Sequence, residues 1–100
     1  MDIIISGKNL VMTPSMRAVI ERKLGRLERF WQRLIRMHVE ISINRHHRRG
    51  DVFVAYGWVE SPGDDLRASA EGESFAAAVD VLYAKLERLV VKAKERSVRI

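Results

Sequence analysis

Basic side chains recur at helical spacing in two separate segments of the chain. Between residues 22 and 36 the arginines step by four, three, four and three positions, and between residues 85 and 99 the basic residues step by three, four, four and three. Residues at these spacings share one helix face, so each segment predicts a row of positive charge. The rows are Arg22, Arg26, Arg29, Arg33 and Arg36, with Lys23 beside them, and Lys85, Arg88, Lys92, Arg96 and Arg99.

The charge distribution favours a polyanionic partner such as a nucleic acid. The chain has 18 Lys and Arg against 13 Asp and Glu, for a formal net charge of +5. The positive charge is concentrated in residues 14–36 and 85–100, whereas acidic residues outnumber basic ones in 37–84. A solvated surface is the other reading, but such a surface normally intersperses both signs. Two same-sign rows side by side predict a positive groove or ridge that suits phosphates.

Little in the chain could support catalysis or metal binding. It has no cysteine, which excludes disulfides, thiolate zinc sites and cysteine nucleophiles. His46 and His47 stand among arginines in a turn and lack a third ligand. No serine or threonine is matched with a base, and no glycine-rich phosphate loop occurs. We therefore expect no enzyme activity, no cofactor, no metal and no small-molecule substrate.

The chain shows no membrane or secretion signal. Its apolar runs are far shorter than the ~18–20 residues that cross a bilayer. The N-terminal residues lack the basic region and the long apolar region of a secretory signal. No membrane partner and a cytoplasmic location are expected.

The hydrophobic period changes five times, which predicts six elements in the order β-α-β-β-β-α. Thr13 and Pro14 are typical of a helix start. A right-handed crossover through the first helix makes the first two strands parallel, and hairpins join the others. This is an α+β two-layer sandwich, one four-stranded mixed sheet with both helices on one face. The strands are expected at 2–6, 37–43, 51–59 and 66–70, and the helices at 14 to about 36 and 75 to about 96.

The aromatic residues are assigned by their register with the apolar positions. Trp31 and Trp58 each fall in an apolar stripe, so we expect both to anchor the core. Ile4 and Phe53 are expected to project from the sheet face that no helix covers. His38 alternates away from the apolar set of its strand and is expected to be exposed.

Three stretches together resemble the ribosome hibernation promoting factor family, also called the ribosome-associated inhibitor or sigma-factor modulation family. They are T-P-S-M-R-A-V-I-E-R-K-L-G-R-L-E-R-F, then A-S-A-E-G, then V-D-V-L-Y-A-K-L-E-R-L-V-V-K-A-K-E-R. The resemblance spans residues 3 to about 96, and the K-L-x-R-L-E and A-K-L-E-R segments are fairly specific in combination.

The resemblance implies a fold like that of double-stranded RNA-binding domains, and the small ribosomal subunit as partner. Members bind its rRNA in the mRNA channel between head and body, overlap the tRNA and mRNA sites, and silence translation in stationary or stressed cells. By the resemblance, Lys23 and Arg26 match basic positions of the family's first helix, and those of its second helix are matched by Lys85, Arg88, Lys92 and Lys94. Combined with the rows, the RNA-binding residues we assign are Arg22, Lys23, Arg26, Arg29, Arg33, Lys85, Arg88, Lys92, Lys94 and Arg96.

The chain also departs from the family pattern. Ala84 replaces a usual acidic residue, Leu89 a usual glutamine, and Ala76 a usual aromatic. The turns at 44–50 and 61–65 are longer than in typical short members. Because the sequence ends at Ile100, we expect a single ribosome-binding domain, 1–100, of the short form, without the C-terminal dimerisation domain of long members.

Two alternative functions stay open at this point. The uncovered sheet face, with Ile4 and Phe53, could dock a protein partner, and it could also support a weak homodimer. A generic double-stranded RNA binder without ribosome preference would use the same basic rows.

Overall fold

The computed structural model describes residues 1–45, 48 and 50–98 of the chain. The predictions for His46, His47 and Arg99 lie outside these residues. The sheet has the order β1-β2-β3-β4, with β1 parallel to β2 and the other neighbours antiparallel. The elements are β1 (Asp2–Gly7), α1 (Pro14–Leu24), the 3₁₀ helix η1 (Gly25–Arg29), β2 (Arg36–Asn44), β3 (Val52–Glu60), β4 (Leu66–Gly72) and α2 (Phe75–Val98).

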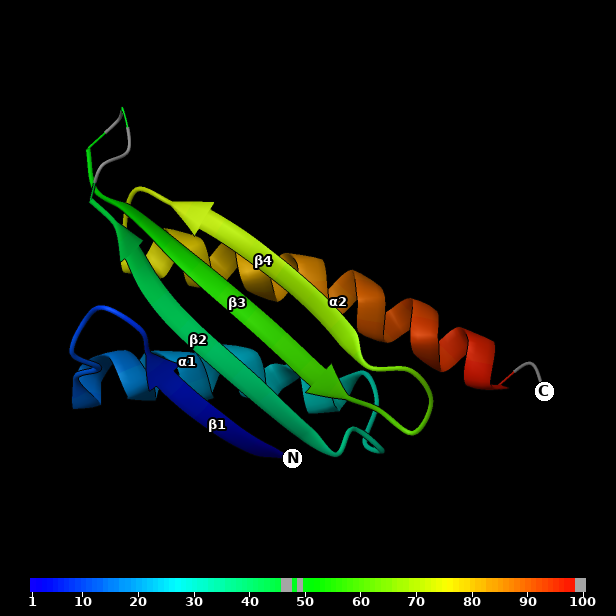
Figure 1. The fold of residues 1–100 in the computed structure, drawn as a ribbon. Coiled ribbons are helices and arrows are strands. Elements are labelled where there is room, and N and C mark those ends of the chain that lie inside the picture. Colours follow the sequence, from blue (N-terminus) through cyan, green and yellow to red (C-terminus); the bar gives the residue numbers. More distant parts are fainter. Residues whose placement is uncertain (46–47, 49, 99–100) are drawn as a thin grey trace.

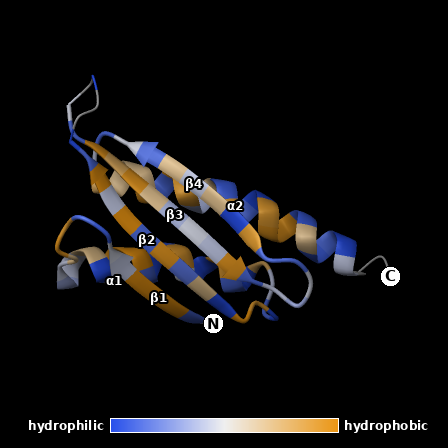
Figure 2. Ribbon diagram, viewed as in Figure 1, coloured by the Kyte–Doolittle hydropathy of each residue, from blue (hydrophilic) through white to orange (hydrophobic). Residues whose placement is uncertain are grey.

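Both helices cover the same face of the sheet, α1 behind β1 and β2 and α2 behind β3 and β4 (Figure 1). The expected α+β two-layer sandwich and its element order are therefore confirmed. Hydrophobic and hydrophilic residues alternate along β2 (Figure 2), and its hydrophobic residues Met37, Val39 and Ile41 are buried. Between the layers lies one core, in which Ile20, Leu24, Leu27, Leu82 and Leu86 are fully buried.

Side-chain caps fix where each helix begins. The backbone N–H of Met16 donates to Thr13 Oγ1 at 3.1 Å, and Pro14 occupies the first turn, where no N–H is required. At α2, the N–H of Ala77 donates to Ser74 Oγ at 3.1 Å. Each hydroxyl satisfies an amide that the helix itself leaves free.

The first helix is shorter than predicted. It ends at Leu24, continues as η1, and the chain then turns into β2 at Arg36. Leu27 is still buried, because residues three apart lie on one side of a 3₁₀ helix, as Leu24 and Leu27 do. Trp31 and Leu34, in the turns that follow η1, are buried as well. The prediction that Arg33 and Arg36 continue the helical row is therefore wrong.

The structure corrects the predictions for the two aromatic residues Trp58 and Phe53 of β3. Trp31 is a core residue as predicted, but Trp58 pairs with His38 and Arg67 on the open face, and the prediction for it was wrong. Phe53 packs against the core instead of projecting from the open face. Alternation could not predict which side of β3 is buried, because residues 52–59 are almost all apolar and both sides of the strand carry apolar residues. Ile4 is half-exposed on the open face, as expected.

Two glycines let α2 approach the sheet. A Cβ at Gly57 would lie 2.9 Å from Leu86 Cδ1, and a Cβ at Gly72 would lie 2.5 Å from the backbone nitrogen of Ala78. The Leu86 methyl can move aside, whereas the helix backbone cannot. A side chain at Gly72 must therefore push β4 and α2 apart.

Gly72→Ala should lower the free energy of unfolding by about 1–3 kcal/mol, the usual penalty for overpacking. Gly25→Ala is the matched control, because Gly25 has φ −60° and nothing within 4 Å of an added Cβ. The control should raise the free energy of unfolding by up to about 1 kcal/mol. Urea unfolding followed by circular dichroism measures both. A neutral Gly72→Ala would mean that the two elements are not in tight contact.

Candidate nucleic-acid interface

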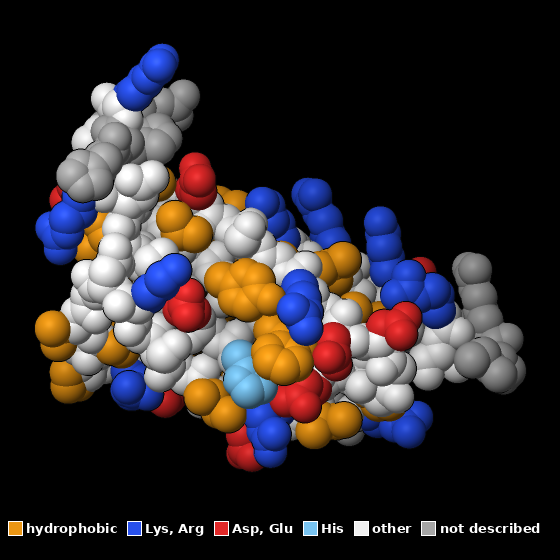
Figure 3. All heavy atoms as spheres, in the orientation of Figure 1, with side chains coloured by type: hydrophobic (Ala, Val, Ile, Leu, Met, Phe, Trp, Pro, Cys, Tyr) orange, Lys and Arg blue, Asp and Glu red, His pale blue; other side chains and the backbone are white. Residues whose placement is uncertain are grey.

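The basic row of α2 lies on the flank of the helix next to β4. Lys85 Nζ donates to the backbone oxygen of Ser69 in β4 at 2.7 Å. Arg88 and Lys92 follow at three and four residues, within about 60° of Lys85 around the helix at ~100° per residue. Lys and Arg side chains project from the edge of the molecule where α2 lies behind β4 (Figure 3). Arg96 continues this row and, like Arg88 and Lys92, is exposed.

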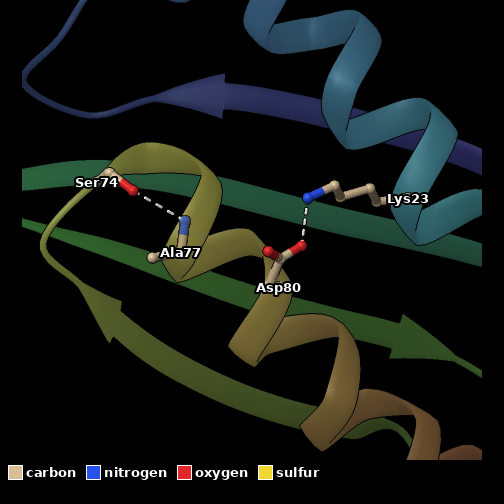
Figure 4. A network of polar contacts seen from close by, with 4 residues as sticks. All are labelled: Lys23, Ser74, Ala77 and Asp80. Atoms are coloured by element: carbon tan, nitrogen blue, oxygen red, sulfur yellow. Dashed lines mark hydrogen bonds and ion pairs between the residues drawn. The ribbon is translucent and has the colours of Figure 1, made fainter.

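The opposite flank of α2 faces α1. Asp80 forms an ion pair there with Lys23 of α1, close to the Ser74 cap (Figure 4). The Lys23 side chain is 25% exposed, whereas Asp80 is 61% exposed. Lys23 thus joins the two helices, and its charge is already matched by a carboxylate.

The two basic rows are not arranged as the predicted groove requires. Because Asp80 faces α1 and Lys85 faces β4, the α2 row lies on the side of the helix away from α1. The two rows do not face each other across the helix seam where Lys23 and Asp80 meet. Arg22, Arg26 and Arg29 are exposed on α1 and η1, and Lys94 is exposed on the Asp80 flank of α2 by helical geometry.

The two basic segments come together at one end of the molecule. A hollow of about 400 Å³ is lined by Arg33, which follows η1, and by Arg96, near the end of α2. Trp31, Ala93, Ser97 and the β3–β4 turn from Ser61 to Asp64 complete its walls. Although Arg33 has left the helical row, the fold places it beside the end of the α2 row. Arg36, in contrast, lies on the sheet and pairs with Glu60 at 3.7 Å.

Sequence reasoning missed a second cluster, on the open sheet face. His38, Trp58 and Arg67 are cross-strand neighbours there, and Tyr56 lies next to them. His38 is on the predicted face but is partly buried against the indole of Trp58. The register of the strands brings these residues together, and the sequence alone does not give that register.

Within the described ranges, no group of three or more His, Cys, Asp or Glu side chains could hold a metal ion. No helix in the same residues is long and apolar enough to cross a membrane.

Comparison with known proteins gives the family. The family model described as "Sigma 54 modulation protein / S30EA ribosomal protein" matches residues 3–98. The chain belongs to this family. The ribosome hibernation promoting factor of Azotobacter vinelandii is 31% identical over 98 residues, covering 98% of this chain and 87% of the relative. That of Klebsiella oxytoca is 30% identical over 96 residues, which is 96% of each chain.

Two solved structures share the fold. A ribosomal subunit interface protein from Coxiella burnetii matches with a TM-score of 0.84 at 27% identity, covering 95% of this chain and 99% of the other. The N-terminal domain of Thermus thermophilus Protein Y matches with a TM-score of 0.75 at 27% identity, covering 92% and 98%. The family resemblance drawn from the three sequence stretches is confirmed.

Lys23→Ala and Asp80→Ala should each lower the free energy of unfolding by no more than about 1 kcal/mol, because the Asp80 carboxylate is largely exposed and solvent screens the pair. The coupling in a double-mutant cycle should be smaller still and should fall as salt is added. Urea unfolding at low and high ionic strength measures it. A coupling well above 1 kcal/mol that salt does not change would contradict a solvent-screened pair.

Proposed function

We propose that this protein is a ribosome-associated hibernation factor that binds rRNA of the small ribosomal subunit. Family membership and the names of its relatives support association with the ribosome. The proposed site is the mRNA channel, where occupancy blocks access of mRNA and tRNA under stress or in stationary phase. Ribosome binding would place the protein in the cytoplasm.

The main support for RNA binding in this proposal is the basic row of α2. Lys85, Arg88, Lys92 and Arg96 are exposed, and none of them forms an ion pair within the described part of the chain. At 1.5 Å per residue the row extends about 16 Å along a rigid helix. Four unneutralised cations held in line on one flank repel each other, and that cost is relieved when phosphates lie against them.

The mechanism requires no chemical step. Cations of the two rows replace counterions on the rRNA phosphates, so binding gains from counterion release and weakens with salt. Arg33 and Arg96, on the shared hollow, would extend the contact from α2 toward the end of η1. Inhibition then follows from the volume that the bound protein occupies.

The combined variant Lys85→Glu, Arg88→Glu and Lys92→Glu should abolish binding to small subunits while the helical content is kept. All three side chains are exposed, so their replacement leaves the core unchanged. Co-sedimentation with isolated small and large subunits at two salt concentrations measures binding, and circular dichroism checks the fold. The unsubstituted protein should pellet saturably with small subunits only, and less at the higher salt.

The matched control is Lys8→Glu, Arg17→Glu and Arg45→Glu, which makes the same change in net charge at exposed positions outside both rows. This control should bind within a factor of about three of the unsubstituted protein, because position and not net charge decides contact. Equal losses in the two triple variants would contradict the assigned interface. Equal pelleting with both subunits would favour a generic RNA binder.

A further inference from the structure

The open face of the sheet carries an ordered cluster of aromatic and charged side chains. Trp58 lies between His38 of β2 and Arg67 of β4. The His38 and Trp58 rings are stacked, with centroids 4.5 Å apart and planes 19° apart, and Arg67 Cζ lies 4.8 Å from the indole centroid. Figure 3 shows hydrophobic side chains and the histidine gathered over the middle of the sheet.

Polar contacts hold these side chains in place. Glu60 Oε2 lies 3.1 Å from His38 Nε2 and 3.7 Å from Arg36 Nη1, and Arg67 Nη1 donates to the Tyr56 hydroxyl at 3.5 Å. Side chains that are already ordered lose little conformational freedom when a partner arrives. Pre-ordered Trp, Tyr and Arg residues are typical of the centres of protein interfaces.

Beside this cluster the face is hollowed. The hollow has a volume of about 240 Å³, and its lining includes Ile4, Ser6, His38, Glu40, Tyr56 and Trp58. Glu40 supplies a carboxylate, Tyr56 an aromatic ring, and Ile4 an apolar wall. No Lys or Arg lines the hollow within the described residues. A carboxylate beside aromatic and aliphatic groups suits a side chain with a cationic head and a methylene stem.

The charge of the open face is opposite to that of the helix rows. Its strands present Asp2, Glu40, Glu60 and Glu71 on this side, against Arg36 and Arg67. Glu60 pairs with Arg36 and His38, which leaves the other three carboxylates outside any ion pair of the described chain. RNA phosphates would meet these carboxylates at close range and be repelled. The occupant that complements the face is therefore a basic protein segment.

We propose that the open sheet face binds an arginine- or lysine-bearing segment of a partner protein, with the cation in the hollow between Glu40 and Tyr56. The aliphatic stem of that residue lies against Ile4, which is 49% exposed in the free protein. This site is separate from the RNA-binding rows and does not depend on the proposed ribosomal function. It also replaces the pair Ile4 and Phe53 as the basis for a protein contact, because Phe53 belongs to the core.

The indole N–H of Trp58 is a direct reporter of the hollow. Its Nε1 is the one buried side-chain polar atom without a hydrogen-bond partner in the described part of the chain. Trp31, 6% exposed and in the core on the other side of the sheet, supplies the second indole signal as an internal control. The probe is the peptide acetyl-Gly-Leu-Arg-Leu-Arg-Gly-amide, titrated into the whole chain and followed by ¹H–¹⁵N NMR.

The Trp58 indole signal should shift saturably at millimolar peptide, while the Trp31 signal stays in place. The same peptide with glutamate for both arginines should cause no shift. Glu40→Gln should weaken binding about fivefold or more, because it removes the charged partner of the cation. Glu71→Gln removes a carboxylate of the same face outside the hollow and should change binding by less than about twofold. Tyr56→Ala should weaken binding as Glu40→Gln does.

Three outcomes would overturn the proposal. The first is the absence of a saturable Trp58 shift with the arginine peptide. The second is an equal loss in Glu40→Gln and Glu71→Gln, which would reduce the effect to net charge. The third is a Trp58 signal that responds to single-stranded RNA or to the protein's own concentration instead of the peptide, which would make RNA or a second copy the occupant. Ribosome co-sedimentation is a separate measurement, so failure of either proposal is recognised independently.

Discussion

The close packing of α2 on β3 and β4 is the constraint on which the rest of the structure depends. Gly57 leaves space for Leu82 and Leu86, and Gly72 lies against the backbone at Ala78. Contacts at two points along the helix fix its rotation about its own axis as well as its distance from the sheet. The rotation in turn decides which side chains face α1 and which face β4. The basic row therefore lies at the β4 edge because of apolar packing, and its own charges contribute little to its position.

The elements and the α2 row could be predicted from the sequence because local periodicity determines them. The α1 row could be predicted only in part, since spacings of three and four residues do not distinguish an α-helix from a 3₁₀ helix followed by turns. Long-range contacts position the chain that follows η1. Arg36 must pair beside Asp2 at the start of a parallel ladder, and the N–H of Ile35 already donates to the Glu60 oxygen at 2.9 Å.

Trp58 illustrates a second limit of sequence reasoning. In a strand with apolar residues on both faces, alternation gives two equally good assignments of the buried side. In the structure, the buried side is the one that carries Ala55 and Gly57, because only small residues leave room for Leu82 and Leu86. The large ring of Trp58 is then placed on the open face. The same close packing that positions the basic row of α2 thus also exposes the aromatic cluster.

The two faces of the molecule consequently differ in chemistry. On the helix side, the α2 row presents cations that form no ion pair within the described residues, whereas the sheet side presents carboxylates around stacked rings. The β4 strand lies between them, since Ser69 accepts from Lys85 while Arg67 of the same strand covers Trp58. The two proposed sites share no residue, so occupation of one face should leave the affinity of the other nearly unchanged. Such a molecule is suited to a location where nucleic acid lies on one side and basic protein on the other.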